Sequence, residues 1–468
     1  MGLVLLGLYI IPETGIVWDD PIQRGYGLIV YDYIFGSNPF LLSYKDRFYG
    51  PFFEFILILG EKILGLKATS SVYIYRHVMG YVFYLIGVFF FYLLTLKLFS
   101  FGSKKTDKLF ACFLSCVFVL TPRVFGHSFM NTKDIPFMVM FLISIYFLLH
   151  FIEKPSVNRA VCLGIVTGIL IDIRVIGFFV LGIMGSTSAS RLIGDLFSKG
   201  IKHVLISIKK CLLNTVCFKH VNLRFTRHVC WVGCFFVSLF ITIYLFWPTL
   251  WENPFLIFDA VTEMSRFPWN GDVLFMGKYV NSNELPWTYL LVWIGITIPV
   301  LTLIMAVTGL IVQISDSSNW TKVSFQVLFL WIVLPLGIIV GKGAVLYDDW
   351  RHAYFLYPVI ILFSGFGFAY FYSKLDGVRI GFIDMKKASL YFCLFYFGVI
   401  GWQLIKDREY SYVSFNSFAY AWGSQIGDNF ELDYWGLSYK ELLEYIVEEG
   451  VDTHKRTVIR LISDNYPG

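Results

Sequence analysis

The sequence predicts an all-α polytopic membrane protein with about eleven transmembrane helices. Of its 468 residues, 57% are hydrophobic, 19% are aromatic and only 15% are charged, whereas soluble domains carry roughly 25% charged residues. The apolar residues form long runs rather than the ~10-residue alternating segments of a transmembrane strand. A helix satisfies its own backbone hydrogen bonds in lipid, so these runs indicate a helical bundle.

The expected spans follow one another along the chain. They lie at about 1–13, 72–98, 108–122, 135–152, 160–173, 175–190, 229–247, 286–313, 325–342, 352–373 and 388–404. The first is short against the ~20 residues that a span needs. We expect it to be a membrane helix rather than a signal peptide, because it lacks a charged leading segment and a small-residue cleavage site.

Lysine and arginine are concentrated in alternate loops, which predicts the orientation. The basic loops are 100–108, 153–159, 191–228 and 373–387. Such loops stay in the cytoplasm, so the alternate segments are expected outside: 14–71, 123–134, the turn at 174, 248–285, 343–351 and 405–468. This predicts a transmembrane domain over 1–404, with an extracytoplasmic first loop at about 14–71 and a cytoplasmic basic loop at about 191–228. A small extracytoplasmic lobe would follow over 405–468.

Two helices are expected outside the spans. Residues 51–66 are apolar but too charged to span, which favours a juxtamembrane helix lying on the bilayer surface. Residues 438–449 carry an apolar stripe behind a capping box of Ser438 and Glu441, which predicts a short amphipathic helix.

Carboxylates stand at two of the expected outward positions. Asp19 and Asp20 follow the first span. Adjacent carboxylates can supply a general base or hold a divalent cation, and a solvated helix end is the alternative. Asp134 opens the span at 135–152, where it would cap the helix. His127, Asn131 and Lys133 crowd into the same short loop.

Further polar residues of the expected outward segments are cations, and one is aromatic. Arg174 lies between apolar runs, where a charge is costly unless it faces a cavity or a partner. Arg351 and His352 open a later span, and an arginine fork matches phosphate oxygens; reaching to the interface is the alternative. Lys45 and Tyr49 belong to the first outward loop.

These residues favour a reaction between a lipid-phosphate donor and an acceptor hydroxyl at membrane depth. No GxxxxGK[ST] motif occurs in the sequence, and a lipid-linked donor needs none because its phosphoester bond is already activated. Nucleic acid is not an expected partner, because no basic patch alternates with exposed aromatic residues.

Several motifs resemble the GT-C superfamily of membrane glycosyltransferases, specifically the family 39-like group of protein mannosyltransferases and aminoarabinose transferases. The most specific are "NTKDIPF" (131–137) and "RHAYFLYP" (351–358). The acidic pair at 19–20, "YGP" (49–51) and "FELDYWGLSYKE" (430–441) extend the likeness over nearly the whole chain. The resemblance implies a GT-C-like fold and inverting transfer of a sugar from a polyprenyl-phosphate donor to an acceptor hydroxyl on a lipid, glycan or protein.

The resemblance also implies residue roles. The catalytic base would be Asp20 or, as the second choice, Asp19, and Asp134 would position the acceptor. A divalent cation, Mg²⁺ or Mn²⁺, would be held by Asp20 and Asp134. The donor phosphate would be bound by Lys133, Arg174, Arg351 and His352, and the rest of the site wall would be His127, Asn131, Lys45 and Tyr49.

Two departures from the family pattern concern the acceptor. The second residue of the first motif is Asp rather than Glu, and the tail is short. Both favour a bacterial enzyme in the inner membrane, surrounded by membrane lipids, with its site facing the periplasm.

Two other functions stay open. A flippase for lipid-linked sugars would share the phosphate-binding cations, although a carboxylate pair on one face does not suit alternating access. An oligosaccharide ligase would take a whole glycan from a pyrophosphate-linked lipid. Dependence on a metal would favour single-sugar transfer over the ligase.

Overall fold

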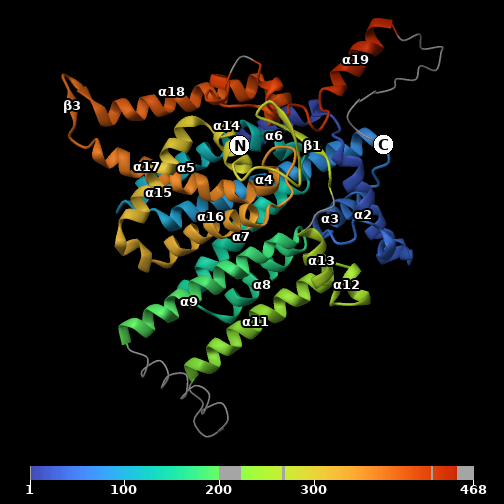
Figure 1. Ribbon diagram of the computed structural model, residues 1–468, viewed down its shortest axis with the longest axis horizontal. Helices are drawn as coiled ribbons and strands as arrows, with labels where there is room; N and C mark the ends of the chain where they lie inside the picture. The colour runs from blue at the N-terminus through green and yellow to red at the C-terminus, as the bar shows by residue number, and fades with distance from the viewer. Residues whose placement is uncertain (1, 200–222, 266–268, 423–424, 451–468) are drawn as a thin grey trace.

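The computed structural model describes residues 2–199, 223–265, 269–422 and 425–450 (Figure 1). In chain order its elements are α1 (Gly2–Ile10), η1 (Ile11–Glu13), α2 (Asp19–Gly36), η2 (Pro39–Ser43), α3 (Phe52–Ile63), α4 (Thr69–Leu98), α5 (Lys104–Val119), α6 (Pro122–Met130), α7 (Asp134–Glu153), α8 (Val157–Ile171), η3 (Val175–Phe178), α9 (Phe179–Lys199), α11 (Leu223–Phe246), α12 (Thr249–Glu252), α13 (Leu256–Met264), β1 (Asp272–Phe275), β2 (Lys278–Asn281), α14 (Tyr289–Thr297), α15 (Val300–Ser315), η4 (Ser317–Thr321), α16 (Val323–Lys342), η5 (Arg351–Leu356), α17 (Tyr357–Lys374), β3 (Arg379–Ile380), β4 (Ile383–Asp384), α18 (Met385–Lys406), η6 (Arg408–Val413), η7 (Ala419–Trp422), η8 (Ile426–Asp428) and α19 (Tyr439–Gly450). The strands form two small antiparallel hairpins, β1–β2 and β3–β4.

The expected all-α polytopic membrane fold is confirmed. Within the described ranges, five helices are long and apolar enough to cross a membrane: α4, α7, α16, η5 with α17, and α18. The pair α5 and α6 passes the same test together, with a bend of 73° between its halves. Shorter apolar helices cover the other expected spans: Gly2–Glu13, Val157–Ile171, Val175–Ser190, Cys230–Phe246 and Val300–Ser315.

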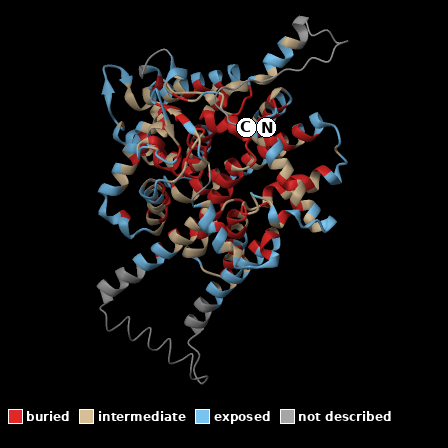
Figure 2. Ribbon diagram, turned by 45° about the vertical axis from the view of Figure 1, so that its right-hand side comes forward, coloured by how far each residue is buried: buried red, intermediate tan, exposed pale blue. Residues whose placement is uncertain are grey.

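The centre of the bundle is formed by α7 and α17. In each, 72% of the most apolar window is buried, and Figure 2 shows the buried residues gathered in the middle of the molecule. Around this centre α4 and α8 pack on α7, α11 packs on α8, and α15 packs on α17. By contrast α18 is only 17% buried and crosses the outside of the bundle, as its apolar surface would do in contact with lipid (Figure 1).

Glycines bring α15 and α17 into close contact. A Cβ atom on Gly309 would lie 1.9 Å from the carbonyl oxygen of Phe363, and one on Gly367 would lie 2.0 Å from that of Met305. Small residues at a crossing let two helix backbones approach each other within a membrane. This contact with α15 fixes the position of α17, the helix that follows Arg351 and η5.

One predicted span and one predicted loop differ from the structure. Residues 286–313 form two helices, because Pro299 has no amide hydrogen to continue the ladder after α14. The expected outward loop 123–134 is mostly the buried helix α6, which begins at Pro122, where a proline suits the first turn.

Other predictions outside the spans have mixed outcomes. The helices expected at 51–66 and 438–449 are confirmed as α3 and α19. The long helix α2 was not expected, since Gly25, Gly27 and Gly36 are poor helix formers. The loop at 191–228 is helical to Lys199 and from Leu223, and its middle part lies outside the described residues.

Helices of the two segments 14–71 and 248–285 gather at one end of the bundle. There α2, α3, α12 and α13 lie together on the right of Figure 1, whereas α9 and α11 extend toward the opposite end. Buried ion pairs attach this end to α4, since Arg76 contacts Glu54 and lies 3.1 Å from Glu61, which also pairs with Arg24 at 2.9 Å. A buried charge is stable only when it is paired.

Candidate functional site

Asp134 lies at the start of α7 with its carboxylate between two guanidinium groups. Arg351 Nη1 is 3.1 Å from Oδ2, and Arg174 Nη2 contacts Oδ1. Asp134 is only 2% exposed and Arg351 only 3%. Because removal of one partner would leave a buried charge uncompensated, the three residues form one network, which we call the Arg174–Asp134–Arg351 network.

Asp134 is the first residue inside α7, and the side chain of Asn131 accepts hydrogen bonds from the amides at the start of this helix. The Oδ1 atom of Asn131 accepts hydrogen bonds from the backbone N–H groups of Lys133 at 3.1 Å and Asp134 at 2.7 Å. Its Nδ2 donates to the Asp134 carboxylate at 2.9 Å. The predicted capping role of Asp134 is therefore wrong, because its side chain turns toward the arginines while Asn131 takes the free amides.

Arg351 is shared among three carboxylates. Besides Asp134, its Nη2 lies 2.9 Å from Asp348 and its Nη1 lies 4.0 Å from Asp19. The rings of Tyr347 and Trp435 flank the guanidinium at 5.0 and 5.1 Å, where a cation is attracted to the ring faces. A single nitrogen of Arg351 thus joins the second acidic motif to the first.

The adjacent carboxylates at 19 and 20 occupy different environments. The Asp19 side chain is 36% exposed beside Arg351. Asp20 is 1% exposed, accepts a hydrogen bond from the Val17 N–H at 3.2 Å and lies 3.2 Å from His77 Nε2. His77 belongs to α4 and therefore holds Asp20 against this helix.

A second acidic pair, Asp348 and Asp349, was missed by the sequence analysis. Both residues have positive φ, 53° and 66°, a conformation that Asp tolerates better than most residues. Asp349 Oδ2 accepts hydrogen bonds from Arg123 Nη1 at 3.0 Å and the Tyr354 hydroxyl at 2.9 Å, and its Oδ1 accepts from the Arg351 N–H. The available signal was the run "DDWR", which repeats the first pair next to an arginine.

Burial changes the electrostatics of Asp348. It raises the pKa of this carboxyl to about 6, although Arg351 opposes the shift. Asp348 is therefore ionised at neutral pH and loses its attraction for Arg351 in mild acid.

The C-terminal segment reaches the site through Tyr434 and Trp435. The Tyr434 hydroxyl donates to Asp349 at 2.8 Å and lies 2.8 Å from His127 Nε2. The Trp435 ring lies 4.8 Å from the His127 ring, and Asn131 Nδ2 is 3.1 Å from His127 Nδ1. The predicted wall residues thus stand against the network, His127 within α6 and Asn131 directly after its last residue.

Lys133 and Tyr49 form a contact of their own. The Lys133 ammonium lies 3.3 Å from the centre of the Tyr49 ring. Burial, followed by the positive charge of Arg174, lowers the pKa of Lys133 to about 8. Lys45, by contrast, is exposed and has no ion pair among the residues that the structure describes.

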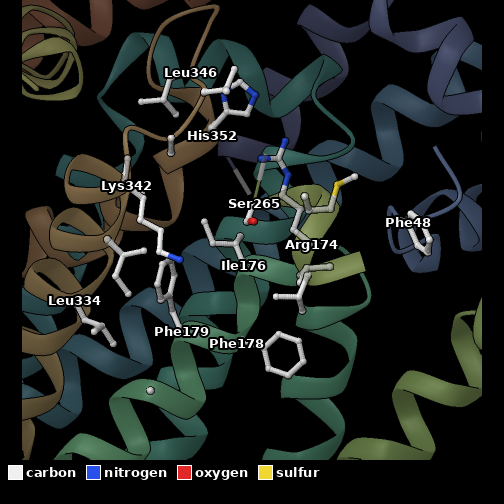
Figure 3. A pocket seen from close by; sticks show the side chains of 18 of the residues that line it. Phe48, Arg174, Ile176, Phe178, Phe179, Ser265, Leu334, Lys342, Leu346 and His352 are labelled. Carbon is white, nitrogen blue, oxygen red and sulfur yellow. The ribbon is translucent and has the colours of Figure 1, made fainter. Parts of the chain in front are cut away.

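A cavity of about 490 Å³ lies beside the network (Figure 3). Arg174 and His352 stand together at its polar end, and the His352 ring packs on Tyr347 at 4.6 Å. Most of the remaining wall is apolar, with Phe48, Val175, Ile176, Phe178, Phe179, Val261, Met264, Leu334, Ile338, Ile339, Val345 and Leu346. A cavity with a cationic end and an apolar body fits an anion that carries a long apolar chain.

The predicted divalent cation does not fit the surroundings of Asp134. Both oxygens of this carboxylate face guanidinium groups, which a cation would have to displace. No group of three His, Cys, Asp or Glu side chains suited to a metal occurs in the described part of the chain. The cation expected between Asp20 and Asp134 stays a prediction.

The chain was compared with known proteins. No family model and no curated protein matches the sequence. Among solved structures it is similar to the archaeal oligosaccharyltransferase AglB from Archaeoglobus fulgidus in complex with an inhibitory peptide and a dolichol-phosphate, with 13% identity, a TM-score of 0.43, and coverage of 86% of this chain and 50% of that one.

Two further structures of the Archaeoglobus fulgidus oligosaccharyltransferase are similar. The complex with Zn and sulfate has 12% identity, a TM-score of 0.41, and coverage of 87% of this chain and 48% of that one. The form tethered to an acceptor peptide with the NVT sequon has 12% identity, a TM-score of 0.42, and coverage of 87% and 50%. The chain spans about half the length of the solved structures it matches.

Proposed function

We propose that the chain is a GT-C-type glycosyltransferase that moves a sugar, with inversion, from a polyprenyl-phosphate donor to an acceptor hydroxyl. Its site would face the periplasmic side of a bacterial inner membrane. One observation carries the proposal: the Arg174–Asp134–Arg351 network has the apolar cavity on its Arg174 side and the partly exposed Asp19 on its Arg351 side.

The donor has a natural orientation in this arrangement. Its prenyl chain would fill the apolar part of the cavity, and its phosphate would lie at Arg174 and His352. The sugar would then extend toward Arg351 and Asp19, where the acceptor hydroxyl arrives. Guanidinium and imidazole groups are suitable donors to a phosphate ester.

Asp19 is the better placed carboxylate for the base. It is partly exposed beside Arg351, whereas Asp20 is buried against His77. The proposal therefore reverses the preference for Asp20 that the sequence suggested. Asp20 instead fixes the turn before α2 through its bond to the Val17 N–H.

The transfer needs one proton movement and one displacement. Asp19 takes the proton of the acceptor hydroxyl, and the oxygen attacks the anomeric carbon from the face opposite the phosphate. The bond between that carbon and the phosphate oxygen breaks, and the lipid phosphate leaves with an additional negative charge. Arg174 and Lys133 stabilise this charge as it develops.

The test is sugar transfer by the purified protein in detergent, with radiolabelled polyprenyl-phosphate sugars and a membrane extract as acceptor. Wild type, Asp19→Asn, Asp20→Asn and Asp134→Asn are compared with and without EDTA. We expect Asp19→Asn to lose at least about 100-fold in rate, as removal of a general base does, and Asp20→Asn to retain more activity. EDTA sensitivity would support the predicted cation.

Two outcomes point to other functions. Movement of labelled lipid across liposomes without donor consumption, equal in wild type and variants, would replace the enzyme with a flippase. Consumption of only pyrophosphate-linked glycans would replace single-sugar transfer with a ligase reaction.

A further inference from the structure

Lys342 is a further cation of the cavity wall. It is the last residue of α16 and lines the cavity together with Arg174 and His352. Arg174 is paired with Asp134, whereas Lys342 has no carboxylate within ion-pair distance among the described residues. The two cationic side chains of the cavity therefore differ in how far their charge is already compensated.

The side chain of Lys342 extends over the apolar wall. Figure 3 shows it pointing toward Phe179, with Leu334 on the same side of the cavity. Lys342 is an exposed residue, and its aliphatic stem covers part of the apolar wall, as lysine stems at a protein surface commonly do. An ammonium without a carboxylate partner at the edge of an apolar cavity favours a ligand that is anionic at one point and apolar elsewhere.

We propose that Lys342 captures the phosphate of the lipid-linked donor and so helps the protein distinguish lipid phosphates from neutral prenyl lipids. The inference rests on the proposed function. Both oxygens of Asp134 are paired with arginines and not with Lys342, so Lys342 stands outside the Arg174–Asp134–Arg351 network and is assigned to donor binding. Arg174, held in the network, acts on the charge that develops during transfer. Lys342 would thus contribute to donor binding, and Arg174 to the transfer step.

Binding can be measured without knowledge of the sugar. Purified full-length protein in detergent is titrated with polyprenyl phosphate, with polyprenol of the same length, and with inorganic phosphate as competitor. The variants are Lys342→Gln and Lys342→Arg. The matched control is Lys278→Gln, because Lys278 is an exposed lysine of β2 outside the cavity wall.

We expect Lys342→Gln to weaken polyprenyl phosphate binding about tenfold, the size of one charge-assisted contact, and to leave polyprenol binding unchanged. Lys342→Arg should retain most of the affinity, Lys278→Gln should match wild type, and inorganic phosphate should not compete. Wild-type affinity in Lys342→Gln would overturn the inference and leave the proposed function intact. Equal wild-type affinity for both lipids would overturn the proposed donor together with it, and competition by inorganic phosphate would assign Lys342 to a free anion.

Transfer kinetics separate capture from chemistry. With a labelled donor, Lys342→Gln should raise KM several-fold and leave kcat nearly unchanged, which marks loss of uniform binding. Arg174→Gln should lower kcat instead. An equal fall of kcat in both variants would contradict the division of roles.

Discussion

Arg351 Nη1 lies 3.1 Å from Oδ2 of Asp134, although the two residues are 217 positions apart in the chain. In the described part of the chain they begin the two most buried of the five membrane-length helices, η5 with α17 and α7. One ion pair therefore joins the ends of the central helices at the point where the cavity and Asp19 meet.

The strength of this pair can be measured by a double-mutant cycle. Arg351→Gln removes the arginine and leaves the buried carboxylates beside it without a counter-charge. We therefore expect the free energy of unfolding to fall by about 3–5 kcal/mol. Asp134→Asn combined with Arg351→Gln should cost less than the sum of the single changes. The exposed pair of Lys386 and Asp376 is the control, since Lys386→Gln should leave the unfolding free energy nearly unchanged. Additive costs for the buried pair would contradict a direct interaction.

Donor binding should depend on the protonation of Lys133. Its pKa of about 8 in the folded protein lies below its ordinary value of 10.5, so the ammonium is charged below pH 8 and neutral above it. Affinity for polyprenyl phosphate should fall as pH rises through 8. Lys133→Arg keeps the charge over this range and should remove that fall. An identical pH profile in wild type and variant would show that another group titrates.

The lowered pKa of Lys133 also predicts how the stability of the protein changes with pH. Between pH 8 and 10.5 the unfolded chain binds the proton of Lys133 and the folded chain does not. Stability should therefore rise with pH over this interval relative to Lys133→Met, which has no proton to lose. Thermal unfolding of both proteins across the interval measures the difference, and parallel curves would refute the lowered pKa.

Tyr434 should stabilise the site through its hydroxyl. Tyr434→Phe removes the donor to Asp349 and the partner of His127, so we expect a loss of about 1–3 kcal/mol and a lower rate of transfer. Tyr420 of the same segment is 59% exposed, and Tyr420→Phe should change stability by at most about 0.5 kcal/mol. Equal unfolding temperatures for the two variants would count against a structural role of the Tyr434 hydroxyl.

The crossing of α15 and α17 should not tolerate a side chain. Gly367→Ala would place a methyl group against the Met305 carbonyl and push the helices apart, at a cost of about 1–3 kcal/mol. Gly337 of α16 has open space around it, and Gly337→Ala should be neutral or stabilising, because alanine is the better helix former. Unfolding temperatures in detergent compare the two, and a neutral Gly367→Ala would mean that the helices can separate without cost.

Sequence patterns predicted those helices whose formation depends on residues within the helix itself. Apolar runs placed α4, α7, α16 and α18, since a span needs only length and hydrophobicity. The charged apolar segment at 51–66 and the capping box at 438–441 predicted α3 and α19 for the same reason.

The contacts within the site could not be predicted in this way. Asp349 meets Arg123 across 226 positions and Asp20 meets His77 across 57, and no periodicity encodes such pairs. The role of Asn131 at the start of α7 was hidden because Asp134 suits the same position. The sequence was enough to name residues with suitable chemistry. Their contacts could be identified only from the folded structure.

The contact between Tyr434 and His127 joins positions 307 apart, and this distance has a consequence for synthesis. Membrane helices are inserted one after another as the ribosome proceeds, so α6 and α7 are in the bilayer long before Tyr434 and Trp435 are translated. Until then Asp349 has no tyrosine from the tail, and Arg351 has no tryptophan ring beside it. A nascent chain is therefore without a finished site until Tyr434 and Trp435 have been translated.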